Sequence, residues 1–124
     1  MTIDANIVID LLNGDARVAE TLRNWFTSHI TLYLPTVAET EILSLSRLTP
    51  IERREIEALI EENFTSVPYN RIVARIAADI RRTTKIKLPD AAIAATALYT
   101  HTPIVTRNVQ DFRRILNLEV IDIK

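Results

Sequence analysis

The chain has 124 residues with no cysteine, one glycine and five prolines, and 48% of its residues are hydrophobic and 25% charged. This apolar content excludes intrinsic disorder, and the absence of cysteine excludes a disulfide scaffold. The net charge of −1 conceals an asymmetry, because residues 1–68 hold 5 Lys and Arg against 11 Asp and Glu, whereas residues 69–124 hold 10 against 5. We expect an acidic and a basic surface patch, although solvated helix faces would explain both sets of charges equally well.

No stretch of the sequence predicts a membrane span or an export signal. The longest apolar runs, such as residues 7–9 and 91–95, are far shorter than the roughly 20 residues of a membrane helix. Asp4 stands where a signal peptide carries basic residues, and Asp10 interrupts the apolar stretch around it. We therefore expect one soluble domain that spans residues 1–124, has no membrane association and is located in the cytoplasm.

The first third of the chain predicts two helices and a buried strand, after a short apolar lead over residues 1–3. Residues 5–12 are apolar and are followed by an Asn-Gly pair, which is a typical signal for the end of a helix. Residues 15–26 predict a second helix, and residues 30–34 predict a strand. The apolar face of the second helix consists of Val18, Leu22, Trp25 and Phe26.

The middle of the chain predicts three helices and a short strand. Residues 36–48 form the first helix, and the pair Thr36 and Glu39 predicts a capping box at its N-terminus. The next helix begins at Thr49-Pro50 and carries an acidic run. Residues 64–67 predict a strand, and residues 70–84 an amphipathic helix. The inner face of this last helix consists of Ile72, Ile76 and Ile80.

The last third predicts an alanine-rich helix over residues 89–99, a buried strand over residues 104–105, a short helix over residues 109–116 and a strand over residues 120–123. Short apolar strands that alternate with helices are typical of an α/β layered domain with a mostly parallel sheet. In such sheets, ligands bind beyond the carboxyl ends of the strands.

Four acidic residues from separate segments fall where this edge of the sheet is expected: Asp4, Glu41, Asp90 and Asp111. Gathered carboxylates repel one another, so the arrangement makes sense mainly if a divalent cation neutralises them. Oxygen ligands without histidine or cysteine favour Mg²⁺ or Mn²⁺ over zinc. Local explanations exist as well, because Asp4 can cap the following helix and Asp90 suits a helix N-terminus. Asp111 lies three residues after Asn108, a spacing close to that of a capping box. Spacing alone leaves both interpretations open.

Several stretches resemble the PIN domain family, in particular the VapC-like toxins of bacterial toxin–antitoxin pairs. The stretches occur in the family's order, span nearly the whole chain, and comprise residues 3–10, 39–44, 88–97, 105–108 and 111–112. The resemblance implies a PIN-like three-layer α/β/α domain with a short central sheet. It departs from the family pattern at Ala5, where threonine is usual, and at Asn108, where an aspartate would add a charge for a second metal ion.

The resemblance also implies roles for individual residues. Asp4, Glu41, Asp90 and Asp111 would form the family's acidic quartet, in which Asp4, Asp90 and Asp111 hold the metal and Glu41 is a further ligand or the base. Three supporting residues would hold the site together: Asn6, Thr106 and Asn108. Basic residues of the second half would bind the RNA backbone, foremost Arg107, Arg81 and Arg82. The other candidates are Arg71, Arg75, Lys85, Lys87, Arg113 and Arg114.

The activity that follows from the resemblance is a Mg²⁺-dependent endoribonuclease, with Mn²⁺ as a possible substitute. Such a toxin would form a homodimer and be silenced by a cognate antitoxin protein. One alternative is a catalytically silent PIN-like module that binds RNA or a protein. Another is a Mg²⁺-dependent phosphatase, against which Asn6 argues, because that chemistry usually places a second aspartate two residues after the first.

Overall fold

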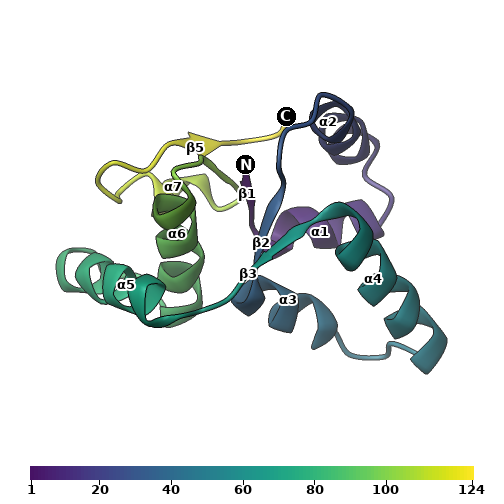
Figure 1. Ribbon diagram of the computed structural model, residues 1–124, viewed down its shortest axis with the longest axis horizontal. Helices are drawn as coiled ribbons and strands as arrows, with labels where there is room; N and C mark the ends of the chain where they lie inside the picture. The colour runs from purple at the N-terminus through teal and green to yellow at the C-terminus, as the bar shows by residue number, and fades with distance from the viewer.

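Five short strands form a single sheet in the computed structural model, which describes residues 1–124 (Figure 1). The strands are β1 (Thr2–Ile3), β2 (Tyr33–Pro35), β3 (Thr65–Val67), β4 (Ile104–Val105) and β5 (Val120–Ile121). Every neighbouring pair is parallel, and the order across the sheet is β3-β2-β1-β4-β5. The expected α/β fold with a mostly parallel sheet is therefore confirmed.

Seven helices cover the two faces of the sheet. They are α1 (Ala5–Leu12), α2 (Ala16–Thr27), α3 (Thr36–Leu43), α4 (Pro50–Asn63), α5 (Arg71–Thr83), α6 (Leu88–Thr100) and α7 (Val109–Phe112). Figure 1 shows α1 to α4 on one side of the strands and α5 to α7 on the other, which is the expected three-layer arrangement. The right-handed crossover rule explains it, because the chain moves one way along the sheet from β1 to β3 and the other way from β3 to β5.

The two strands β1 and β4 are buried, whereas the edge strands β3 and β5 are partly exposed. Ile3 of β1 is in register with Val105 of β4, and the Asp4 N–H donates to the Val105 carbonyl at 3.0 Å. Parallel strands end at the same edge of a sheet, so Asp4 and Thr106, which follow these two strands, become neighbours. This edge carries the candidate site.

The alanine-rich helix α6 is buried on all sides from Ala91 to Ala97. A helix that is apolar around its whole circumference belongs in the interior, and small side chains let it approach α5 and the sheet closely. Asp90 lies in the first turn of this helix. The packing of α6 therefore fixes the backbone position of Asp90.

One helix in the middle of the chain, α3, differs from the sequence prediction in its N-terminal cap and in its end. The expected capping box at Thr36 is absent, because β2 continues through Pro35 and the Thr36 hydroxyl accepts the N–H of Tyr69 at 3.2 Å. Helix α3 ends at Leu43 rather than at residue 48, since Arg47 has a φ of 70°, through which no right-handed helix continues. The expected start of α4 is confirmed, and Thr49 forms a capping box with Glu52.

Elsewhere, the bounds of strands and helices differ by a few residues from those predicted from the sequence. Strand β2 begins at Tyr33 rather than at residue 30, because the Ile30 N–H donates back to the Trp25 carbonyl and closes α2. Helix α7 has a single turn and ends at Phe112 rather than at residue 116. Strand β5 ends at Ile121.

The predicted inner face of α5 is confirmed at Ile80 but is wrong by one position at Ile72 and Ile76. Val73, Ala77 and Ile80 are its buried residues, whereas Ile72 is 56% exposed and Ile76 is only half-buried. Ala77 faces inward because α5 packs against the alanine-rich α6, where a small side chain permits close approach. On α2, Phe26 was expected in the apolar face but is 49% exposed. None of the seven helices combines the length and the apolar character that a membrane span requires.

Candidate active site

Asp4 is the buried centre of the candidate site. Its side chain follows β1, and the residue is only 5% exposed. One carboxylate oxygen, Oδ1, accepts the N–H of Ala5 at 2.7 Å, and the other, Oδ2, accepts the Thr106 hydroxyl at 2.7 Å. Burial raises the pKa of Asp4, and the nearby charge of Asp90 adds to this, although the bonds from Thr106 and Ala5 act in the opposite direction.

The loop after β4 supports Asp4 through the Thr106 hydroxyl. Thr106 Oγ1 also accepts the backbone N–H of Asn108 at 3.0 Å and lies 3.4 Å from the donor Nδ2 of Asn6. Asn6 Oδ1 accepts the backbone N–H of Arg107 at 3.2 Å. Asn6 therefore reaches Asp4 through Thr106, not by a direct hydrogen bond, and both expected supporting residues lie around the Asp4 carboxylate.

Asn108 and Asp111 form a second pair at the start of α7. Asn108 Nδ2 donates to Asp111 Oδ2 at 3.1 Å, and the Asn108 side chain makes no capping hydrogen bond to the helix backbone. Asp111 is exposed, so its carboxylate is open to solvent on the side away from Asn108. The pair thus holds one carboxylate near the sheet edge.

Electrostatic effects link all four acids. Partial burial raises the pKa of Asp90, the charge of Asp111 raises it further, and Lys87 acts in the opposite direction. The pKa of Glu41, at the surface of α3, is raised by partial burial and by the charges of Asp4 and Asp90. Carboxylates perturb one another in this way only at short range. Asp4, Glu41 and Asp90 therefore influence one another, and Asp111 is linked to the set through Asp90.

These residues match the donor chemistry of a hard divalent cation, because every candidate ligand is an oxygen and each Asp4 oxygen keeps a lone pair beyond its single hydrogen bond. Their positions do not form a closed shell, since no group of three or more acidic or histidine side chains lies close enough to hold an ion. Glu41 and Asp111 are exposed to solvent. The carboxylates therefore belong to one region of the protein, but they do not surround a position for a cation.

Arg107 forms ion pairs within the protein. Its guanidinium contacts three carboxylates, with Nε 2.9 Å from Asp10, Nη2 3.2 Å from Asp15 and Nη1 3.6 Å from Asp122. Nη1 also donates to the carbonyl of Ile123. We call this set the Arg107 clamp. The charge of Arg107 is paired within the protein, and its binding of RNA stays a prediction from the sequence.

Arg81 and Arg82 lie elsewhere, in the last turn of α5. They line a surface hollow of about 600 Å³ together with Lys85 and Lys87, two further residues that the sequence analysis named as candidates for binding the phosphate backbone.

Comparisons with known proteins identify the family and agree with the fold. The family model described as "PIN domain" matches residues 1–117. A toxin–antitoxin complex from Klebsiella pneumoniae is 28% identical with a TM-score of 0.78, and the match covers 97% of this chain and 94% of that chain. The structure of VapBC2 from Rickettsia felis bound to a promoter DNA fragment has a TM-score of 0.85 at 17% identity, covering 98% and 96%. FitAcB from Neisseria gonorrhoeae has a TM-score of 0.78 at 23% identity, covering 97% and 95%. No curated protein matches the sequence.

Proposed function

The chain belongs to the PIN domain family, and we propose that it is a metal-dependent endoribonuclease that acts as the toxin of a toxin–antitoxin pair. The observation that carries the proposal is the cluster of Asp4, Glu41, Asp90 and Asp111, in which burial and mutual repulsion raise the pKa of three carboxyls. Such a cluster destabilises the protein without a cation, so it is best explained by a function that uses one.

Each residue has a distinct part in the proposed reaction. Asp4, Asp90 and Asp111 would hold Mg²⁺ or Mn²⁺, and the Thr106 hydroxyl keeps Asp4 ionised and oriented. A cation bound there supplies Lewis-acid chemistry for the scissile phosphate and the attacking water. Glu41 would accept the proton of that water, and its raised pKa suits a general base. Asn108 would keep the Asp111 carboxylate directed into the cluster.

We propose that the protein partner of this chain is a cognate antitoxin. The Klebsiella pneumoniae structure, the neighbour with 28% identity, is described as a toxin–antitoxin complex, and its match covers nearly the whole of both chains. A homodimer and a cytoplasmic location stay predictions from the sequence.

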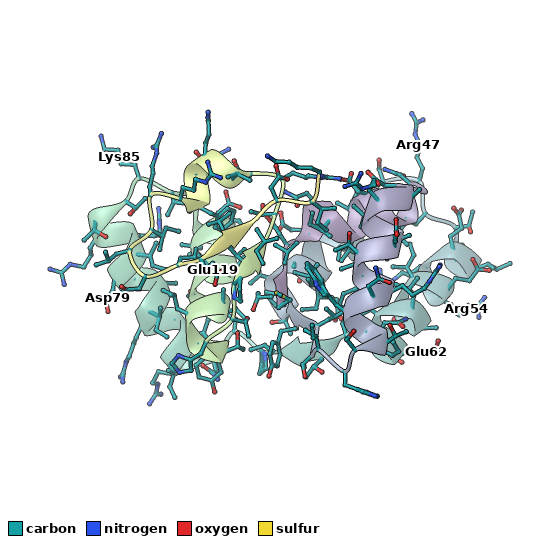
Figure 2. The ribbon with its side chains drawn as sticks, turned by 90° about the horizontal axis from the view of Figure 1, so that it is seen from above. Arg47, Arg54, Glu62, Asp79, Lys85 and Glu119 are labelled. Atoms are coloured by element: carbon teal, nitrogen blue, oxygen red, sulfur yellow. The ribbon has the colours of Figure 1, made fainter.

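The test is cleavage of a mixed RNA pool by the purified protein with Mg²⁺, with Mn²⁺ and with EDTA. We expect cleavage with either metal, none with EDTA, and a loss of about 100-fold or more in Asp4→Asn, Asp90→Asn and Glu41→Gln. Glu62→Gln is the matched control, because Glu62 is an exposed carboxylate on α4 with no ion pair (Figure 2). Cleavage that persists in EDTA or survives these site substitutions would contradict the proposal.

One observation favours the second candidate, a catalytically silent module that binds RNA or a protein. The four carboxylates do not form a closed metal site. A silent module would show no rise in its unfolding temperature when Mg²⁺ is added, whereas a metal-dependent enzyme would show a rise that Asp90→Asn abolishes. Thermal unfolding with and without Mg²⁺ therefore separates the two candidates without an activity assay.

A further inference from the structure

A cationic hollow lies between the end of α5 and the start of α6. It measures about 600 Å³, and Ala78 and Ile86 contribute its apolar lining. Four of its lining residues are positively charged: Arg81, Arg82, Lys85 and Lys87. An open hollow with this charge is suited to an anion with several oxygens, because arginine and lysine both donate to phosphate.

The four charges are not neutralised within the protein. The ion pairs of the chain involve only Arg53 and Arg107, so no carboxylate pairs with any of the four. The nearest acids along the sequence are Asp79 on α5 and Asp90 on α6, and neither forms an ion pair with them. The hollow therefore carries a concentrated and unpaired positive charge.

One of the cations is fixed in place by the backbone. Arg81 Nε donates to the carbonyl of Ile86 at 3.2 Å, which holds its guanidinium against the connection between the two helices. Its two terminal nitrogens make no hydrogen bond within the protein and are free to donate to a ligand. A side chain that is already held loses less conformational entropy on binding, so this arginine is pre-organised.

A purely structural explanation covers part of the hollow. Arg81 and Arg82 lie in the last turn of α5, where cations stabilise a helix C-terminus through its dipole. Lys85 and Lys87 lie beyond that turn, and Lys87 is the N-cap residue of α6, where a positive charge is unfavourable. The helix dipoles therefore do not explain why the cations continue into α6.

The hollow adjoins the candidate active site. Lys87 stands three residues before Asp90, a separation of about 5 Å along a helix axis. A strand of RNA with its scissile phosphate at Asp90 would pass its next phosphates over Lys87, Lys85 and Arg82.

We propose that this hollow binds the phosphate backbone of the RNA substrate next to the scissile phosphate, through Arg81, Arg82, Lys85 and Lys87. The inference rests on the proposed nuclease function and adds to it a binding subsite on the α5–α6 side. Contacts to phosphates position a strand without reading its bases, so the hollow supplies affinity rather than sequence specificity.

The test compares two double variants that remove the same charge from opposite ends of the molecule. Arg82→Gln/Lys85→Gln removes two cations of the hollow, and Arg47→Gln/Arg54→Gln removes two exposed cations at the other end (Figure 2). Fluorescence anisotropy measures the binding of a labelled single-stranded RNA of mixed sequence over a series of salt concentrations. EDTA is present, so that contacts through a divalent cation are absent and no cleavage occurs.

In the hollow variant we expect weaker binding and a salt dependence, log K against log[salt], that is shallower by about 1.4, since each phosphate contact to single-stranded RNA contributes about 0.7. The control variant should retain the slope of the parent. With Mg²⁺ present, the hollow variant should raise KM and leave kcat nearly unchanged, because its contacts bind ground state and transition state equally.

Failure of this inference is distinguishable from failure of the proposed function. If the parent cleaves RNA but the hollow variant binds and cleaves like the control, the hollow is not a subsite and the nuclease stands. If both double variants lose the same affinity and the same salt-dependence slope, the overall charge explains the binding, and the proposal that the hollow is an RNA-binding subsite is refuted. If the parent never cleaves but the hollow variant alone loses RNA affinity, the hollow stands as the RNA site of a silent module.

Discussion

Replacing Thr106 with valine tests the central electrostatic argument of the candidate site. The substitution keeps the shape of a buried side chain but removes the hydroxyl that donates to Asp4 Oδ2 at 2.7 Å. It also removes the acceptor of the Asn108 N–H. The effect should depend on pH, because the hydroxyl stabilises Asp4 most strongly when this carboxyl is ionised.

The magnitude follows from the type of bond that is lost. A hydrogen bond to a charged group contributes about 1.5–3 kcal/mol to stability, and one between neutral groups about 1 kcal/mol. We therefore expect Thr106→Val to lower the free energy of unfolding by about 1.5–3 kcal/mol at pH 7.5, where Asp4 is more ionised than at pH 4. The loss should shrink towards about 1 kcal/mol as the pH falls through the raised pKa of Asp4 and the carboxyl takes up a proton.

Urea denaturation of the parent and the variant at pH 7.5 and pH 4, in EDTA, measures this difference. Thr96→Val is the matched control, because Thr96 is also buried but its hydroxyl donates to the neutral carbonyl of Ala92 at 2.8 Å. The control should lose less free energy of unfolding than Thr106→Val, and its loss should be about the same at both pH values. A loss in Thr106→Val that is the same at both pH values, or no larger than in the control, would refute the reasoning.

Three further outcomes are expected. Arg107→Met should lower the free energy of unfolding by about 1–2 kcal/mol, because three carboxylates lose their partner. The control Arg53→Met removes one exposed pair with Glu57 and should cost at most about 0.5 kcal/mol in urea denaturation. Equal losses in the two variants would contradict the clamp. Asp90→Asn should abolish cleavage yet stabilise the metal-free protein by about 0.5 kcal/mol after solvent screening, since it removes repulsion from Asp111. Calorimetry in EDTA should show this gain at pH 7 and its disappearance at acid pH, where protonation already relieves the repulsion. The apparent affinity for Mg²⁺, measured by thermal shift, should fall as the pH is lowered towards the raised pKa values of Asp4, Glu41 and Asp90. The reason is that protons compete with the ion for the same carboxylate oxygens. An affinity that does not depend on pH would mean that the ion binds elsewhere.

The gathering of the four acids could be predicted from the sequence because it depends on a general property of parallel sheets. Asp4 and Thr106 follow two short apolar strands, and such strands end at one edge whatever their order. Helix starts such as Thr49-Pro50 could be predicted equally well, since the cap is formed by residues that are close in sequence.

The errors arose where a distant segment decided the outcome. Thr36 has the local pattern of a capping residue, but its hydroxyl accepts the N–H of Tyr69, 33 residues away. The inner face of α5 depends on the alanine surface of α6, which admits Ala77 where the pattern favoured isoleucine. The sequence placed Arg107 beside the site but could not show that Asp10, Asp15 and Asp122 surround its guanidinium.

The Arg107 clamp has a consequence for the order of events during synthesis. Its carboxylates come from residues 10 and 15 and from residue 122, so the beginning and the end of the described chain meet on one side chain. The same arginine lies between Thr106 and Asn108, the loop residues that hold Asp4 and Asp111. The clamp is complete only after residues 122 and 123 leave the ribosome, although a growing chain can order its earlier segments before then. Arg107, at the centre of the loop beside the acidic cluster, therefore acquires its full set of partners only when this C-terminal segment is available.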